Sequence, residues 1–234
     1  MSSILTNFIN IDAPDKDIEF NGIDFTENAF INISNARSIS IRNCRIYGLK
    51  GSNANKYFLK ISGNFPIKVI IERCFFGNNT NVYNLLELNS KLDDGTSICY
   101  NYFKKGNCTH NEIGLYGAVD NSNWNISSNY FEDSQAGIRI GMKYTPICNI
   151  TIDNNTIQCI SVPDQKKWEG LVTIQPYGKI TSTFENVNIT LNGNKLPVNQ
   201  YAYMYIGEND SKLTVDKYPK VTVNGAVYKL LTFN

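Results

Sequence analysis

A short apolar pattern recurs seven times along the chain, and it constrains the fold more than any other feature. Each copy has an apolar–x–apolar pair, a short polar step and a bulky apolar residue, and the copies lie roughly 21 to 39 residues apart. The bulky residues that end the copies are Phe25, Ile46, Phe76, Phe103, Phe131, Ile157 and Leu196. A repeat of that length with period-two alternation inside it predicts one turn of a solenoid.

Two apolar strands are expected in each repeat. The first strand has apolar residues seven and five positions before the bulky residue, with polar residues between them, as in a strand with one face in the core. The five-before column is Phe20, Ile41, Ile71, Ile98, Ile126, Ile152 and Leu191. The inward pairs of the second strand are Ile31/Ile33, Leu59/Ile61, Leu86/Leu88, Ile113/Leu115, Ile138/Ile140, Val172/Ile174 and Tyr203/Tyr205. Parallel stacking of equivalent strands keeps all these columns in register.

Alternation fails between the residues five and two positions before the bulky residue, so the chain must bend there. The last four repeats place Asn101, Asn129, Asn155 and Asn194 at the bend. A side-chain amide carries both donors and an acceptor, so a stack of amides can satisfy every member. We therefore expect an asparagine ladder, the alternative being four unrelated solvent-facing turn residues.

The composition narrows the classes of partner and compartment. The 234 residues carry a formal net charge of +1 with no basic cluster, which argues against nucleic acid and anionic membranes as partners. The N-terminus has no secretory-signal pattern, and no stretch approaches the roughly 20 apolar residues of a membrane span. We expect folding in a reducing cytoplasm, with all six cysteines structural. No Cys-x-x-Cys occurs and His110 is the only histidine, so no zinc site, other metal or cofactor is predicted.

Three phrases of the repeat carry a family resemblance. They are Asn21-Gly-Ile-Asp-Phe25, Ser40-Ile-Arg-Asn-Cys44 and Ile152-Asp-Asn-Asn-Thr-Ile157. They resemble the repeats of the right-handed parallel β-helices of the pectate-lyase-like superfamily, and most of all those of phage tailspikes and fibres. The resemblance implies an all-β chain, a right-handed parallel β-helix of about seven coils.

Three segments follow from the repeat boundaries. Residues 1–17 are expected to form an N-terminal cap or attachment segment, residues 18–207 the parallel β-helix, and residues 208–234 a C-terminal cap. The dipeptide Asn224-Gly225 lies between two short apolar runs, which predicts a two-residue β-hairpin in that cap.

Enzymes of the resembled superfamily cut acidic polysaccharides with clustered carboxylates or bound calcium, and the outer columns offer few charges. Glu72 and Asp153 lie three coils apart, about 14 Å, whereas paired hydrolytic carboxyls need roughly 5–10 Å. Arg42 and Glu72 are expected to form a surface ion pair, and Lys60 and Glu87 a second cross-coil pair. No catalytic residue is assigned.

Aromatic side chains give a better indication of binding, because flat rings stack on sugars and anchor protein interfaces. Trp168 and Tyr177 fall in long inserts, and Tyr201 begins an alternating tyrosine run. These three residues are the candidate binding site.

We therefore expect a non-enzymatic structural or adhesive virion protein of a bacteriophage, a fibre, spike or decoration subunit. The expected partners are other virion proteins or a host surface glycan, and a homotrimer is the expected assembly. One alternative is a polysaccharide lyase or glycoside hydrolase of the same superfamily, and another is a carbohydrate-binding module without catalysis. The expected location is the virion, and the alternative is secretion.

Overall fold

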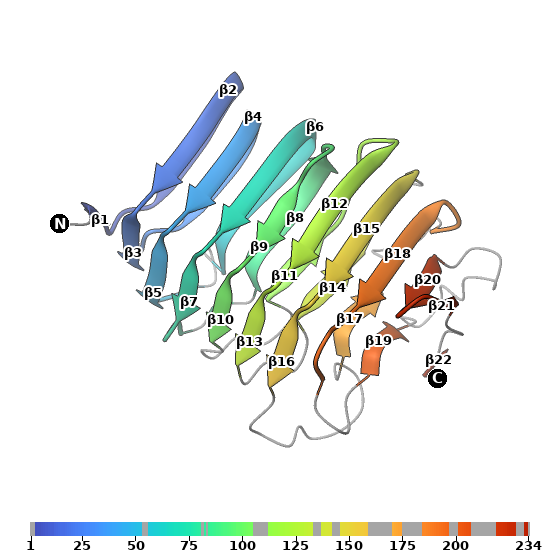
Figure 1. The fold of residues 1–234 in the computed structure, drawn as a ribbon. Coiled ribbons are helices and arrows are strands. Elements are labelled where there is room, and N and C mark those ends of the chain that lie inside the picture. Colours follow the sequence, from blue (N-terminus) through green and yellow to red (C-terminus); the bar gives the residue numbers. More distant parts are fainter. Residues whose placement is uncertain are drawn as a thin grey trace.

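The structure is a computed structural model. It describes residues 3–52, 56–80, 82, 84–104, 112–132, 137–141, 146–158, 170–174, 184–196, 201–206, 219–227 and 232–233. Every regular element within these ranges is a β-strand. The strands form two sheets, and both sheets run along the length of one curled stack (Figure 1).

The smaller sheet has seven strands in the order β1-β3-β5-β7-β10-β13-β16. All its neighbours pair in parallel. Its strands are β1 (Ser3–Leu5), β3 (Ile23–Glu27), β5 (Arg45–Leu49), β7 (Phe75–Gly77), β10 (Tyr102–Lys104), β13 (Tyr130–Glu132) and β16 (Thr156–Gln158).

The larger sheet has 15 strands, and all but one of its pairings are parallel. Its first eight strands are β2 (Ile9–Asn21), β4 (Ile31–Arg42), β6 (Tyr57–Glu72), β8 (Asn84–Leu92), β9 (Ser97–Cys99), β11 (Ile113–Leu115), β12 (Ser122–Ser127) and β14 (Ile138–Ile140). The remaining seven are β15 (Cys148–Asp153), β17 (Gly170–Ile174), β18 (Val187–Asn192), β19 (Tyr201–Ile206), β20 (Lys220–Val223), β21 (Ala226–Val227) and β22 (Thr232–Phe233).

The register of the strands follows the sequence repeat. In the smaller sheet Phe25 pairs with Ile46, Phe76 with Phe103, and Phe131 with Ile157. In the larger sheet the column that starts at Phe20 continues through Ile41, Ile71, Ile98, Ile126, Ile152 and Leu191. The prediction of an all-β chain with stacked parallel strands is therefore confirmed, and the curled arrangement is compatible with a solenoid.

The space between the sheets is filled by these inward columns. The apolar residues of β4, β6 and β8 that face inward are fully buried, and one cluster of buried apolar residues runs through the described part of the stack. Aromatic rings continue from layer to layer within it: the Phe103 ring lies 4.7 Å from Phe76 and 5.0 Å from Phe131, centroid to centroid. Burial of whole apolar columns is the main stabilising contribution that such a stack can have.

The bend between the two sheets has the same backbone conformation in every layer. The residue three positions before each bulky apolar residue has a φ of 52 to 65°, in the left-handed region. These residues are Gly22, Asn43, Arg73, Tyr100, Ser128, Asn154 and Gly193. A left-handed residue costs a non-glycine side chain about 1 kcal/mol, so a whole column of them must be held by its surroundings.

The two ends of the stack differ from each other. At the C-terminal end, β20 pairs in parallel with β18 and antiparallel with β21, through the two left-handed residues Asn224 and Gly225. The predicted hairpin is therefore confirmed. At the N-terminal end β1 pairs with β3 in the smaller sheet, and in the larger sheet the pairing begins at Ile9, which pairs with Ile31, rather than at residue 18. The earlier pairing comes from Ile9 and Ile11, an apolar–x–apolar pair that stacks on the inward residues Ile31 and Ile33 of the next layer.

Phe103→Ala should lower the free energy of unfolding by about 3 to 5 kcal/mol, because it opens a cavity between two stacked rings. Urea unfolding followed by circular dichroism measures this change. The neighbouring Tyr102→Ala is the matched control, since Tyr102 faces outward and is half-buried. Equal losses for the two variants would contradict the assignment of inward and outward faces.

Candidate functional site

The predicted aromatic binding residues lie largely beyond the part of the chain that the structure describes. Trp168 and Tyr177 fall outside the described residues. Tyr201 is the first residue of β19, and its backbone pairs with Gly170 of β17. The structure therefore brings no described surface together around these three residues, and other surfaces have to be considered.

The column that follows the left-handed bend points into the stack. Asn101, Asn129 and Asn155 are 0 to 2 % exposed, and Asn194 continues the same column. The amide nitrogens of the first three donate to the side-chain oxygen of the next asparagine at 3.0, 3.0 and 3.1 Å. Each of those oxygens also accepts the backbone N–H of the preceding asparagine, at 2.9 to 3.0 Å.

The second hydrogen bond of each amide runs back to the preceding layer. Asn101 donates to the carbonyl of Ile71, Asn129 to Ile98, Asn155 to Ile126 and Asn194 to Ile152, at 2.7 to 2.9 Å. These carbonyls belong to the residues five positions before each bulky apolar residue. In each of the first three amides, both hydrogens donate a hydrogen bond and the oxygen accepts one. The buried column of asparagines therefore satisfies its own polar groups.

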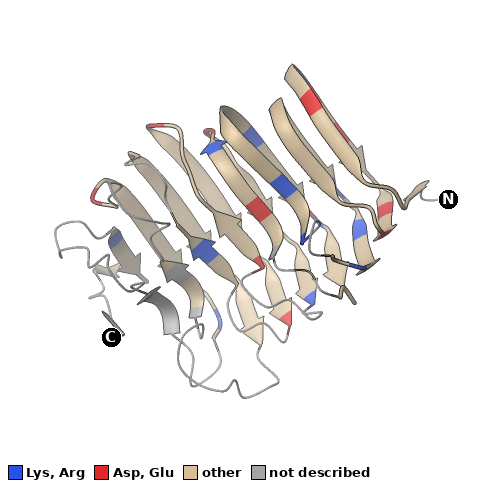
Figure 2. Ribbon diagram, turned by 180° about the vertical axis from the view of Figure 1, so that it is seen from behind, with Lys and Arg blue, Asp and Glu red and all other residues tan. Residues whose placement is uncertain are grey.

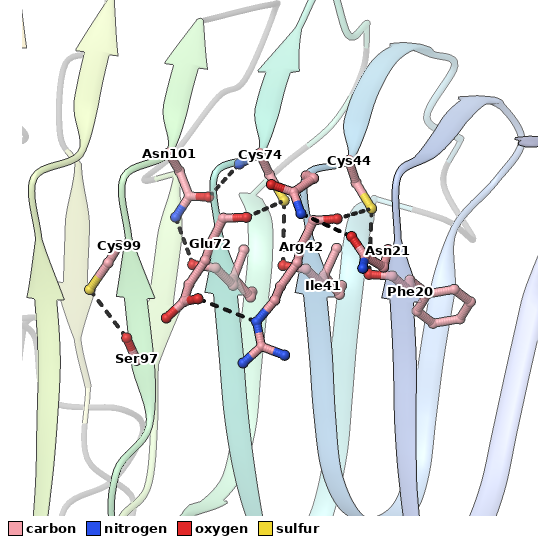
Figure 3. Close-up of polar contacts among 12 residues, drawn as sticks. Phe20, Asn21, Ile41, Arg42, Cys44, Glu72, Cys74, Ser97, Cys99 and Asn101 are labelled. Atoms are coloured by element: carbon pink, nitrogen blue, oxygen red, sulfur yellow. Dashed lines mark hydrogen bonds and ion pairs between the residues drawn. The ribbon is translucent and has the colours of Figure 1, made fainter. Parts of the chain in front are cut away.

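Thiols take the place of amides in the first layers (Figure 3). The sulfur of Cys44 lies 3.6 Å from the carbonyl oxygen of Phe20, and that of Cys74 lies 3.4 Å from the carbonyl oxygen of Ile41. Both carbonyls are the equivalents of those that accept from the asparagines. The N–H of Cys74 donates to the Asn101 oxygen at 2.9 Å, which joins the thiols to the amides in one column.

Two of the buried thiols, those of Cys74 and Cys148, are poor nucleophiles. The hydrogen bond with Cys44, followed by burial, raises the pKa of the Cys74 thiol well above its usual range. Burial raises the pKa of Cys148 from 9.0 to about 12. A thiol that stays protonated is a small apolar side chain with a weak donor, so these two cysteines belong to the packing and not to a reactive site.

The outer face of the larger sheet beside the bend carries one ion pair (Figure 3). The Arg42 Nε lies 3.3 Å from a carboxylate oxygen of Glu72, and both side chains are about one-third exposed. This is the surface pair expected from the sequence, and such a pair contributes about 1 kcal/mol or less. Asp153, farther along the same column, accepts the N–H of Asn192 at 2.9 Å. These charges join neighbouring layers.

A second polar group lies on the outer face of the strands around β11. Gly114 pairs with Glu87 on one side and Arg139 on the other. A Cβ at Gly114 would lie 2.9 Å from the Tyr116 hydroxyl and 3.1 Å from a Glu87 carboxylate oxygen, so both groups stand over bare backbone. The Arg139 guanidinium lies 5.5 Å from the centroid of the Tyr116 ring.

Most members of this group are buried, as is Asp24 of the other sheet at 5 % exposed. Tyr116 is 1 % exposed, Glu87 is 7 % exposed, and the neighbouring Glu112 is 1 % exposed. Figure 2 shows the charged residues of this side as separate bands on adjacent strands. A carboxylate, a phenol and a guanidinium that lie close together in a largely buried place can stabilise the fold as a polar network, or they can transfer protons.

The outer face of the seven-stranded sheet carries a row of aromatic rings on β7, β10 and β13, three strands that lie next to one another (Figure 1). The centroids of Phe75 and Tyr102 are 5.5 Å apart, and those of Tyr102 and Tyr130 are 5.2 Å apart. The interplanar angles are 21° and 14°, so the rings stack on one another. All three side chains are half-buried.

Charged and polar pairs surround this aromatic row. Arg45 makes two hydrogen bonds to Asp24, at 3.0 and 2.7 Å, in the two layers before Phe75. The Lys104 nitrogen lies 3.4 Å from a Glu132 oxygen beside the ring row. Because both signs of charge flank the rings, this face has the composition of a protein-contact surface, with aromatic residues at its centre and a polar rim.

Sequence reasoning did not single out either outer-face group. Phe75, Tyr102 and Tyr130 each directly precede an inward phenylalanine, and three aromatic residues at one repeat position were a signal that periodicity could have found. Tyr116 and Glu112 gave no such signal, because outward positions next to β11 are not expected to be buried.

Comparisons with known proteins and tests for other kinds of site add no further assignment. No protein-family model, no curated protein and no solved structure matches this chain. Within the described residues no group of three or more His, Cys, Asp or Glu side chains is placed to hold a metal ion. Among the same residues no helix is long and apolar enough to cross a membrane.

Asn129→Ala should lower the free energy of unfolding by about 3 kcal/mol, because it leaves buried partners in Asn101 and Ile98 without their hydrogen bonds. Chemical unfolding measures the loss. The matched control is Asn149→Ala, which removes two links between exposed asparagines and should cost about 1 kcal/mol or less. A loss at Asn129 no larger than that at Asn149 would show that the buried column is not a stabilising ladder.

Proposed function

We propose that the chain is a right-handed parallel β-helix of about seven coils that serves as a non-enzymatic structural or adhesive protein of a bacteriophage virion. It would be a fibre, spike or decoration subunit. The support is the register of stacked parallel strands, together with the resemblance of the repeats to phage tailspikes. Long apolar columns and a buried amide file suit a rigid rod whose flanks are available for contact.

The row of Phe75, Tyr102 and Tyr130 is the observation that carries the proposal. Rings that stack on one another cover each other's faces, so their edges are the parts open to a partner, and the Tyr130 hydroxyl donates to the side-chain oxygen of Gln158. A sugar ring stacks on an open aromatic face, whereas a flat protein partner packs against ring edges. The face of the seven-stranded sheet therefore fits another virion protein, and first of all a second copy of the chain in a homotrimer.

The oligomeric state in solution tests this proposal. We expect the protein to sediment as a trimer, and Tyr102→Glu combined with Tyr130→Glu to give monomers, because each subunit then brings two extra carboxylates to a packed face. Asn125→Glu combined with Thr151→Glu is the matched control on the outer face of the larger sheet and should remain trimeric. A wild-type protein that stays monomeric at high concentration would overturn the homotrimer.

An enzyme of the pectate-lyase-like superfamily is the second candidate, and the buried group around Gly114 favours it. Glu87, Tyr116 and Arg139 lie on adjacent strands of an outer face, where an extended polysaccharide can lie across the layers. Tyr116 and Glu87 are only 1 and 7 % exposed, so they would have to become accessible before a phenol or carboxylate could exchange a proton with the sugar.

Incubation with a panel of acidic polysaccharides distinguishes the two candidates. Under our first proposal no chain shortening or unsaturated product accumulates. Turnover by the wild-type protein that falls at least 100-fold in Glu87→Gln, with unchanged circular dichroism, would replace that proposal with the enzyme. Lys60 is exposed on the neighbouring strand, so Lys60→Gln is the control for the loss of a charge alone.

A further inference from the structure

Among the residues that the structure describes, none forms a layer over the N-terminal end of the larger sheet, whereas every inner layer is covered on both sides. Inward residues of β4 are 0 to 2 % exposed, whereas their partners in β2 are all only half-buried. The half-buried residues are Ile9, Ile11, Ala13, Ile18 and Phe20. Next to them, Ile4 of β1 is 62 % exposed and Phe8 is 40 % exposed. An exposed edge with a continuous apolar side is a surface that further strands can cover.

The backbone of β2 has hydrogen-bonding groups directed away from the stack. In a parallel strand, alternate residues bond to opposite neighbours. Ile9 and Gly22 donate to carbonyls at the start and end of the next layer, at 2.8 and 3.0 Å. The N–H and C=O groups of Asn10, Glu19 and Asn21 therefore point to the other side. Within the described residues β2 pairs only with β4.

Charge separates this end from the rest of the chain. Residues 1–28 contain six acidic residues and one basic residue, whereas the remainder contains 15 acidic and 21 basic residues. In the next layer Arg37 and Ser38 bind Asp17, which holds the pKa of that carboxyl well below its usual range. Asp12 and Asp15 are exposed at the same corner of the edge. A strand added on the open side of β2 would lie beside Asp12 and Asp15. In the same way, the strand that contains Arg37 lies beside Asp17 on the other side of β2.

The opposite end of the stack cannot supply that layer through β20. There the strand is already paired on its outer side with β21, in the antiparallel hairpin. Two N-terminal ends facing each other would bring Asp12, Asp15 and Glu19 against the same residues of the second copy, which is repulsive. Neither β20 nor a second N-terminal end therefore satisfies the edge at β2.

We propose that β2 is a docking edge for an extended segment of a partner polypeptide, which adds in parallel as one more layer. The segment has apolar residues at the alternating positions that cover Ile9/Ile11 and Ile18/Phe20, and basic residues at the corner that faces Asp12 and Asp15. Main-chain hydrogen bonds to Asn10, Glu19 and Asn21 provide affinity, and the apolar and basic positions provide specificity.

A peptide with the sequence of residues 31–42, blocked at both ends, is the probe. It is the strand that covers β2 on its other side, and it carries the required apolar spacing with Arg37 and Arg42 as its charges. Added to the full chain, it should slow hydrogen exchange at the amides of Asn10, Glu19 and Asn21. A scrambled peptide of the same composition should leave those amides unchanged.

Two protein variants test the charge requirement. Asp12→Asn combined with Asp15→Asn should weaken peptide binding roughly three- to tenfold at low salt, the size expected for two exposed ion pairs. Asp120→Asn is the control, because it removes an exposed carboxylate elsewhere and keeps the oxygen that accepts the Ile147 N–H. Anisotropy of a labelled peptide measures both affinities.

Three results would overturn the proposal. The first is unchanged exchange at Asn10, Glu19 and Asn21 with saturating peptide. The second is equal weakening by Asp120→Asn and by the double variant. The third is concentration-dependent protection of the same three amides in the protein alone, which would make a second copy the occupant. The trimer test on the Tyr102 face is independent of all three.

Discussion

Six of the seven layers of this stack have a side-chain hydrogen bond at the bend between the two sheets, and the first layer has Ile23 there instead. The side chain after the left-handed residue reaches the carbonyl of the preceding layer, through an amide in Asn101, Asn129 and Asn155 and through a thiol in Cys44 and Cys74. The side-chain bond satisfies a polar group of the bend and links the layers at the point where the two sheets separate.

The amide and the thiol are not equivalent solutions. An amide both donates and accepts hydrogen bonds, so asparagines can stack in a column of any length with every polar group paired. A thiol makes only a weak hydrogen bond and contributes mainly apolar packing. The change from sulfur to amide occurs between Cys74 and Asn101, and the backbone N–H of Cys74 bonds to the first amide oxygen. The stack thus has a more apolar bend in its first layers and a more polar bend beyond.

Much of the fold followed from periodicity, since inward columns such as Ile71 and Ile126 repeat with period two and must stack in register. The failure of alternation located the bend, but not its left-handed backbone, because Arg73 and Tyr100 carry none of the usual glycine or asparagine signal. The added layer at Ile9 was missed because its two apolar pairs are separated by a polar, proline-containing corner. Buried outward groups such as Tyr116 depend on what lies over the sheet, which a strand pattern does not encode.

The column of left-handed residues has a consequence for how such a chain can diversify. These backbones direct their side chains away from the core, and Tyr100 is 63 % exposed, so the interior places little demand on their identity. Gly193 is an exception, because a Cβ there would lie 2.4 Å from the Asn154 oxygen. Gly22 is another, because its left-handed φ of 65° strains any added side chain. At the non-glycine positions of this line, substitutions can accumulate at little cost to the packing of the interior. The side chains of this column lie about 4.8 Å apart on the surface of the stack. New binding residues can evolve there while the packing of the interior stays the same.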